Sequence, residues 1–217
     1  MDIWQGIETE RKLLIEILSD LPIARWDEQS LCGRWRVRDV CGHLLGSWML
    51  GPLAHMRYVA RWGFRMNRAL AEDAIKRGSQ PVEVLLELMR KHAESRRMPP
   101  AIKPEQMLED IVIHGQDIRR PLGIAHTFAP EVLRVVLDTL KDQNGVMAVR
   151  KRIAGLEVVA DDIGWRTGSG QRVAGPAEAV MMAMSGRSAS LFELDGPGAV
   201  VLGERMHAVM DTVALDR

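Results

Sequence analysis

The feature that most constrains the fold is a series of long segments with apolar residues at helical spacing, each bounded by proline or glycine. In the first segment, residues 2–20, the spacing predicts an amphipathic helix that ends before Pro22. Further helices are expected over 37–63 with a kink at Pro52, over 81–97, from 104 to about 120, and over 130–143. Long helices joined by short links favour an antiparallel bundle.

The pattern changes after about residue 150. The stretch "GLEVVADDIGWRTGSG" (155–170) alternates and contains glycine turns, which is typical of strands in a hairpin. "GPAEAVMMAMSGR" (175–187) predicts a short helix, and "SLFELDGPGAVVLG" (190–203) is interpreted as a further strand with a turn. The sequence therefore predicts a mainly α protein, with a helical bundle over 1–148 and a small α+β domain over 149–217.

Charge and cysteine content exclude several classes of protein. The 29 basic and 29 acidic residues cancel, so the chain has no general attraction to nucleic acid or to an anionic membrane. No apolar run reaches the roughly 18 residues of a membrane span, and the N-terminus is unlike a secretory signal. Two cysteines do not make a disulfide framework. We therefore expect a cytoplasmic protein, a monomer or homodimer, with no nucleic-acid or membrane partner.

The stretch "DIVIHGQDIRRPLG" (110–123) is unusually polar for a helix of a core. Asp110, His114 and Asp117 fall within about 60° of one another around a helix. Asp110 and His114 stand at i and i+4, a spacing that lets two side chains meet at one ion. Spacing alone favours a hydrogen-bonded or surface pair, and a metal would need a ligand from another helix. His43 is the best candidate, although its position beside the apolar stripe also fits a half-exposed histidine.

Other reactive residues have weaker cases. Cys41 and His43 lie two positions apart on a helix and point about 200° apart, so they cannot act as nucleophile and base. Cys41 is therefore expected to be a small buried hydrophobic residue, and Cys32 lies in the preceding loop without an assigned role. Asp117 is expected to hydrogen-bond His114. Arg119 and Arg120 could bind a carboxylate. More commonly, such a pair lies at the C-terminal end of a helix, where its positive charge interacts favourably with the helix dipole.

Three blocks in chain order resemble the mycothiol-dependent maleylpyruvate isomerase family, which belongs to the DinB-like metal-binding bundles. They are "WDEQSLCGRWRVRDVCGHLLG" (26–46), the stretch 110–123, and "DDIGWRTGSGQRVAGPAEAVMMAMSGR" (161–187). The resemblance implies a DinB-like four-helix bundle followed by a small C-terminal α+β domain. It also implies a divalent metal, commonly zinc, held by His43, Asp110 and His114, with mycothiol as thiol cosubstrate.

The chemistry implied by the resemblance is isomerisation or S-transfer on a small electrophilic substrate. A metal with three protein ligands can hold the thiol as its reactive thiolate. Arg205 and Arg120 are candidate catalytic residues that would bind a substrate carboxylate. Family members usually carry glutamate in place of Asp110, which is one methylene shorter. The shorter side chain leaves open a bundle that has lost catalysis and acts as a binding or stress-related protein. A metal-dependent hydrolase, which would use the same ligands and a bound water, is a second alternative.

Overall fold

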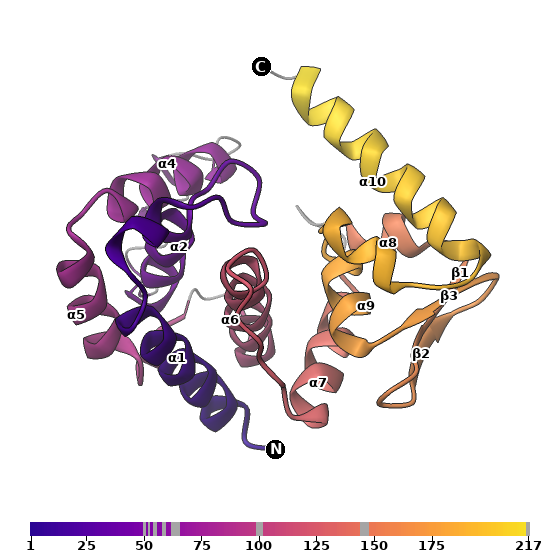
Figure 1. Cartoon of the computed structure of the whole chain (residues 1–217), viewed down its shortest axis with the longest axis horizontal. Helices are drawn as coiled ribbons and strands as arrows, with labels where there is room; N and C mark the ends of the chain where they lie inside the picture. The colour runs from indigo at the N-terminus through magenta and orange to yellow at the C-terminus, as the bar shows by residue number, and fades with distance from the viewer. Residues whose placement is uncertain are drawn as a thin grey trace. The chain divides into compact units, whose positions relative to one another are not determined.

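The chain forms two compact units, Met1–Thr127 and Phe128–Arg217 (Figure 1). The computed structural model describes residues 1–49, 51, 53, 56–57, 60–61, 66–98, 102–143 and 148–215. Sequence patterning placed the boundary after residue 148, whereas the structure divides the chain after Thr127. The reason is that the helix over 130–140 packs on the helix of 177–184 in the second unit.

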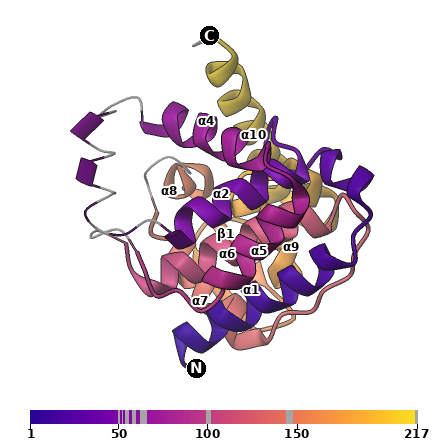
Figure 2. The same cartoon turned by 90° about the vertical axis from the view of Figure 1, so that its left-hand side faces the viewer.

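Four helices of the first unit form a bundle, as the family resemblance implied. Each of its helices packs on two of the others (Figure 2). They are α1 (Ile3–Ser19), α2 (Val37–Met49), α5 (Val82–His92) and α6 (Pro104–Arg119). Asp2 caps α1 by accepting the backbone N–H of Trp4 at 2.9 Å, and Pro104 occupies the first position of α6. The periodic apolar residues fill the core, which includes the fully buried Trp48.

A further helix, α4 (Met66–Gly78), lies along α2 and was not predicted. Within the range 37–63, where one helix was expected, α2 ends at Met49, and the described residues 53, 56–57 and 60–61 are again helical. The predicted kink at Pro52 lies outside the described residues. The two helices approach at glycines. A Cβ on Gly42 would lie 2.3 Å from the carbonyl oxygen of Ala74, and one on Gly78 would lie 2.6 Å from Asp39 Oδ1. Only glycine permits this close approach of two backbones.

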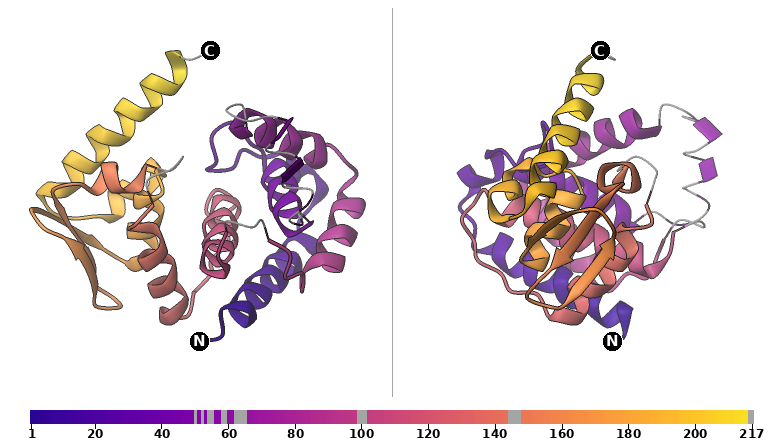
Figure 3. Two further views of the ribbon diagram at one scale, coloured as in Figure 1. Left: turned by 180° about the vertical axis from the view of Figure 1, so that it is seen from behind. Right: turned by 90° about the vertical axis from the view of Figure 1, so that its right-hand side faces the viewer.

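The second unit is built around a three-stranded sheet (Figure 3). Its strands are β1 (Leu156–Ala160), β2 (Trp165–Gly168) and β3 (Gln171–Gly175), in the order β2-β1-β3. Strand β1 pairs antiparallel with β2, as expected for the hairpin, and parallel with β3. The helices of the unit are α7 (Pro130–Leu140), α8 (Val149–Ile153), α9 (Ala177–Met184), the 3₁₀ helix η3 (Ser188–Glu193) and α10 (Pro197–Leu215).

Helix α9 forms the centre of the second unit. Nearly all of its residues are buried, because it contacts the sheet at β1 and β3 as well as α7. A helix that is apolar all round is one that is covered on every side. The predicted short helix at 175–187 is therefore the core element of an α+β unit, and the expected fold class is confirmed.

The strand predicted within 190–203 is wrong. These residues form η3 and the start of α10. Asp195 makes a single bridge to Ala174, Gly196 then turns the chain with φ +96°, and Pro197 begins the helix. A short apolar run such as "AVVL" has the same periodicity signal in a buried strand and in a helix, which explains the error. Within the described residues no helix combines the length and apolarity that a membrane crossing needs.

Candidate metal centre

Two adjacent helices of the bundle supply the site. Helix α2 carries His43 and Ser47, and α6 carries Asp110 and His114. The members of each pair stand four residues apart, so both side chains of a helix lie on one face. Because α2 packs against α6, the two faces meet.

The facing side chains converge on the Asp110 carboxylate. Its Oδ1 lies 3.3 Å from His43 Nε2 and 3.7 Å from His114 Nε2. Ser47 Oγ donates a hydrogen bond of 3.0 Å to the other oxygen, Oδ2. One ligand atom each from His43, Asp110 and His114 lie within 4.8 Å of one another. The structure thus brings together the three residues that the sequence analysis named as ligands.

These separations fit one divalent ion. Zinc bonds of 2.0–2.2 Å at tetrahedral angles separate neighbouring donor atoms by about 3.3–3.6 Å. Of the two distances from Asp110 Oδ1, 3.3 Å falls at the lower end of that range and 3.7 Å lies just above it. Two imidazoles and one carboxylate are also a typical catalytic zinc set, with a fourth position for water or substrate. The Asp110 side chain is therefore long enough to reach both imidazoles in this bundle.

Asp117 fixes the orientation of the His114 ring. Its Oδ2 lies 2.9 Å from His114 Nδ1, and its side chain is fully buried. A carboxylate against Nδ1 orients the ring and leaves Nε2 on the side of Asp110. The hydrogen bond that the sequence predicted between these residues is confirmed.

The environment keeps Asp110 ionised. Burial alone would raise its pKa, but the hydrogen bond with His43, the charges of His43 and His114, and the Ser47 hydroxyl together lower the pKa to about 2. The carboxylate therefore carries its negative charge at neutral pH, which is the form that binds a cation.

A tryptophan covers the two imidazoles. The Trp35 ring centroid lies 5.1 Å from that of His43 and 6.3 Å from that of His114. The loop before α2 holds Trp35 in this position, and the backbone N–H of Trp35 donates a hydrogen bond of 3.0 Å to the Cys32 carbonyl oxygen. Sequence reasoning assigned no site role to Trp35 or Ser47. The spacing of Ser47 four residues after His43 was the available signal for the serine.

Comparisons with known proteins identify the family and the fold of the chain. A family model described as the mycothiol maleylpyruvate isomerase N-terminal domain matches residues 7–119, more than half of the chain. The chain belongs to this family. Two solved structures of mycothiol-dependent maleylpyruvate isomerase, one of them a histidine-to-alanine mutant, share its fold with TM-scores of 0.64 and 0.65. They are 14% and 15% identical, over 91% of this chain and 92% of theirs. No curated protein matches the chain.

The family match over residues 7–119 includes all three proposed ligands. The two arginines that were predicted to bind a substrate carboxylate, Arg120 and Arg205, lie outside it. Arg120 follows the last residue of α6, six residues and about 9 Å along the axis from His114. Arg205 belongs to α10 in the second unit, where its Nη1 donates to the carbonyl oxygens of Arg152 and Ala154, both at 2.7 Å. Their roles toward a substrate stay predictions.

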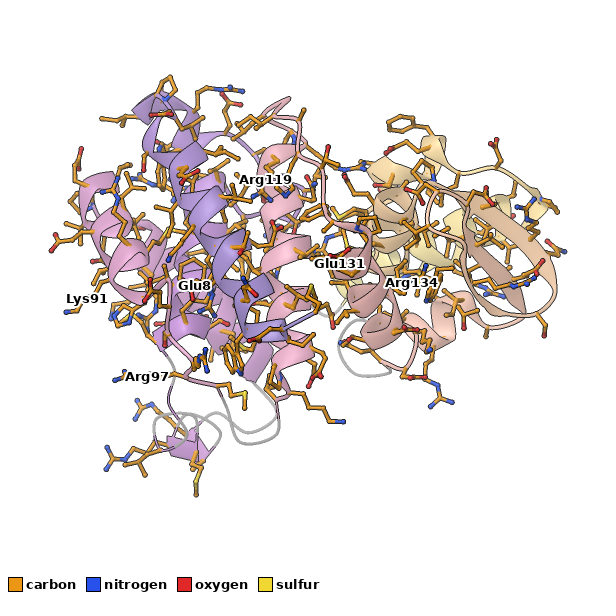
Figure 4. All side chains as sticks on the ribbon, turned by 90° about the horizontal axis from the view of Figure 1, so that it is seen from below. Glu8, Lys91, Arg97, Arg119, Glu131 and Arg134 are labelled. Atoms are coloured by element: carbon orange, nitrogen blue, oxygen red, sulfur yellow. The ribbon has the colours of Figure 1, made fainter. Side chains whose placement is uncertain are left out.

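The arginine beside Arg120 has a structural role in the bundle. Arg119, which is labelled in Figure 4, is buried. Its Nη2 lies 3.9 Å from Glu10 Oε2 of α1. The same Glu10 oxygen is 3.0 Å from His126 Nε2. These partners are distant in sequence, so helical spacing gave no sign of them.

The two cysteines differ in their surroundings. Cys41 is buried in the core, and that burial raises the pKa of its thiol far above the ordinary value, as expected for an inert hydrophobic residue. Cys32 is half-buried and lies near His114 and Asp117, with one ligand atom from each of the three within 4.8 Å of one another. The sequence gave no indication of this second cluster.

Proposed function

We propose that this protein is a metal-dependent enzyme that uses mycothiol to transform a small electrophilic substrate, by isomerisation or S-transfer. The observation that carries the proposal is the convergence of His43, Asp110 and His114 at distances that suit one divalent ion. The family supports the choice of cosubstrate, since the solved structures of the same fold are named mycothiol-dependent maleylpyruvate isomerase. We propose zinc as the metal because two imidazoles and a carboxylate are ligands it favours.

The chain's own residues would hold and orient the reacting groups. His43, Asp110 and His114 bind the ion, while Asp117 and Ser47 fix the orientation of His114 and Asp110. The bound metal would lower the pKa of a coordinated thiol and so supply a thiolate at neutral pH. Trp35, which lies against both imidazoles, keeps water from that side of the cluster. The nucleophile comes from the cosubstrate, in accordance with the buried and inert Cys41.

The two reaction types differ in the fate of the carbon–sulfur bond. The thiolate adds to an activated double bond of the substrate. In an isomerase the adduct rotates about the resulting single bond and expels the thiolate, whereas in a transferase the bond persists in the product. A carboxylate on the substrate would bind an arginine, for which we propose Arg120 and Arg205. A cytoplasmic location is part of the proposal, since the thiol cosubstrate must stay reduced.

The test is to incubate zinc-loaded protein with mycothiol and a panel of electrophiles that includes maleylpyruvate, and to follow the products by mass spectrometry. We expect turnover that requires both zinc and thiol and that is lost in His43→Ala. Turnover without thiol would identify a metal-dependent hydrolase instead. A correctly folded, zinc-loaded protein that transforms none of the panel would favour the non-catalytic bundle.

A further inference from the structure

The structure contains a second group of potential metal ligands that shares one residue with the first. Cys32, His114 and Asp117 each offer a ligand atom within 4.8 Å of the other two. His114 is the one residue that this group shares with the proposed ligands His43, Asp110 and His114. Asp117 lies against His114 Nδ1 at 2.9 Å, whereas Asp110 lies 3.7 Å from Nε2. The carboxylates of Asp117 and Asp110 therefore lie at opposite nitrogens of one imidazole ring.

Backbone hydrogen bonds fix the position of Cys32 beside α6. The N–H of the preceding residue, Leu31, donates to the carbonyl oxygen of Asp117 at 3.0 Å. The N–H of Cys32 donates to Ser30 Oγ at 3.1 Å, and its carbonyl oxygen accepts the N–H of Trp35 at 3.0 Å. The turn that follows passes through Gly33 with φ +57°, a conformation that favours glycine. The thiol is thus held near His114 by a structured loop.

We propose that Cys32, His114 and Asp117 form a second metal site, selective for thiophilic divalent ions such as cadmium or zinc. A thiolate, an imidazole nitrogen and a carboxylate oxygen are a ligand set for such ions, and the thiolate favours the softer ones. Binding releases the Cys32 thiol proton to solvent, and the single proton of the neutral His114 ring lies on Nε2 when Nδ1 binds the ion. Asp117 then exchanges its hydrogen bond to His114 for a bond to the ion.

The two sites compete for His114. A neutral imidazole has one nitrogen that carries a proton and one that carries a lone pair. When Nδ1 binds an ion at Cys32, the proton must lie on Nε2, which then cannot serve the site with His43 and Asp110. A thiophilic ion at Cys32 therefore removes a ligand from the first site. This inference goes beyond the proposed thiol chemistry and holds whether or not the first site is catalytic.

The experiment is a cadmium titration of the full-length protein, followed by the ultraviolet absorption of the thiolate-to-cadmium bond. The double variant His43→Ala, Asp110→Ala removes the first site and isolates the second. We expect this variant to bind one cadmium ion per chain with the thiolate absorption, and to lose both when Cys32→Ser is added. Cys41→Ala, which removes the buried thiol, serves as the matched control and should keep the absorption.

Two results would overturn the second site. One is thiolate absorption that persists in Cys32→Ser, and the other is a folded double variant that shows no thiolate absorption with cadmium. If the double variant does not fold, as judged by its helical circular dichroism, the single Cys32→Ser change in the otherwise natural chain decides the same question. Because the absorption reports cadmium at Cys32 without any substrate, its outcome is independent of whether the protein is an enzyme.

Discussion

At the scale of single residues, the proposed metal site depends most on whether the Asp110 side chain is long enough to serve as a ligand. Its side chain is one methylene shorter than that of glutamate, and the sequence alone could not show whether it reaches a metal. In the structure its Oδ1 lies 3.3 and 3.7 Å from the two imidazole nitrogens. The reach depends on the separation of α2 and α6, which is set by core packing along both helices and not by the residues of the motif.

A substitution of Asp117 tests whether its contact with His114 strengthens zinc binding. Asp117→Asn replaces a buried carboxylate against Nδ1 by a neutral amide, and we expect it to lower zinc affinity at the first site about 10–100-fold. The measurement is competition with a chelator of known affinity, made in a Cys32→Ser background so that only the first site is counted. Asp20→Asn, an exposed change at the end of α1, is the control. Equal affinities in the two variants would contradict the role of Asp117.

The lowered pKa of Asp110 predicts a pH dependence of stability in the metal-free protein. The pKa falls from the ordinary value of 3.8 to about 2 in the folded state. The carboxylate therefore stabilises the fold above about pH 3.8, and this contribution disappears as the pH falls from 3.8 toward 2. Urea unfolding of the natural chain and of Asp110→Asn, compared between pH 5 and pH 2, should show a difference that shrinks with acidification. A difference that stays constant over this range would contradict the pKa assigned to Asp110.

At the scale of elements, the contact between α2 and α4 depends on a glycine next to a proposed ligand. A methyl group at position 42 would lie 2.3 Å from the Ala74 carbonyl oxygen, so Gly42→Ala should force the helices apart at a cost of about 1–3 kcal/mol. Gly46→Ala, one turn further along α2, meets only ordinary contacts at 3.5 Å or more. It should be neutral or should stabilise the helix by up to about 1 kcal/mol. Equal urea midpoints for the two variants would contradict the close packing.

The elements that the sequence predicted well are those that bury large apolar side chains. Helices α1, α6 and α7 have such stripes, and Pro104 and Pro130 mark the starts of two of them. Helix α4 was missed because its buried residues include the small Ala69 and Ala74, which give little apolar periodicity. In the same way, His43, Asp110 and His114 follow from spacing and resemblance, whereas the positions of Cys32 and Trp35 depend on how a loop folds back over α6.

At the scale of the whole molecule, the first site lies within one compact unit. Both α2 and α6 belong to the unit Met1–Thr127, and the family match over 7–119 falls in the same unit. Removal of zinc should therefore raise amide hydrogen exchange in α2 and α6 and leave the strands β1–β3 unchanged, because a ligand stabilises the region that binds it. Exchange that rises equally in both units would show that the metal stabilises the chain as a whole.

The central claim is that His43, Asp110 and His114 bind one metal ion, and the zinc content of purified protein tests it most directly. In a Cys32→Ser background, we predict about one zinc per chain by elemental analysis. Asp110→Ala and His114→Ala in that background should be nearly free of zinc, while His92→Ala, which changes a histidine of α5 outside the cluster, should keep it. Full zinc occupancy in both the Asp110→Ala and His114→Ala proteins would contradict the claim.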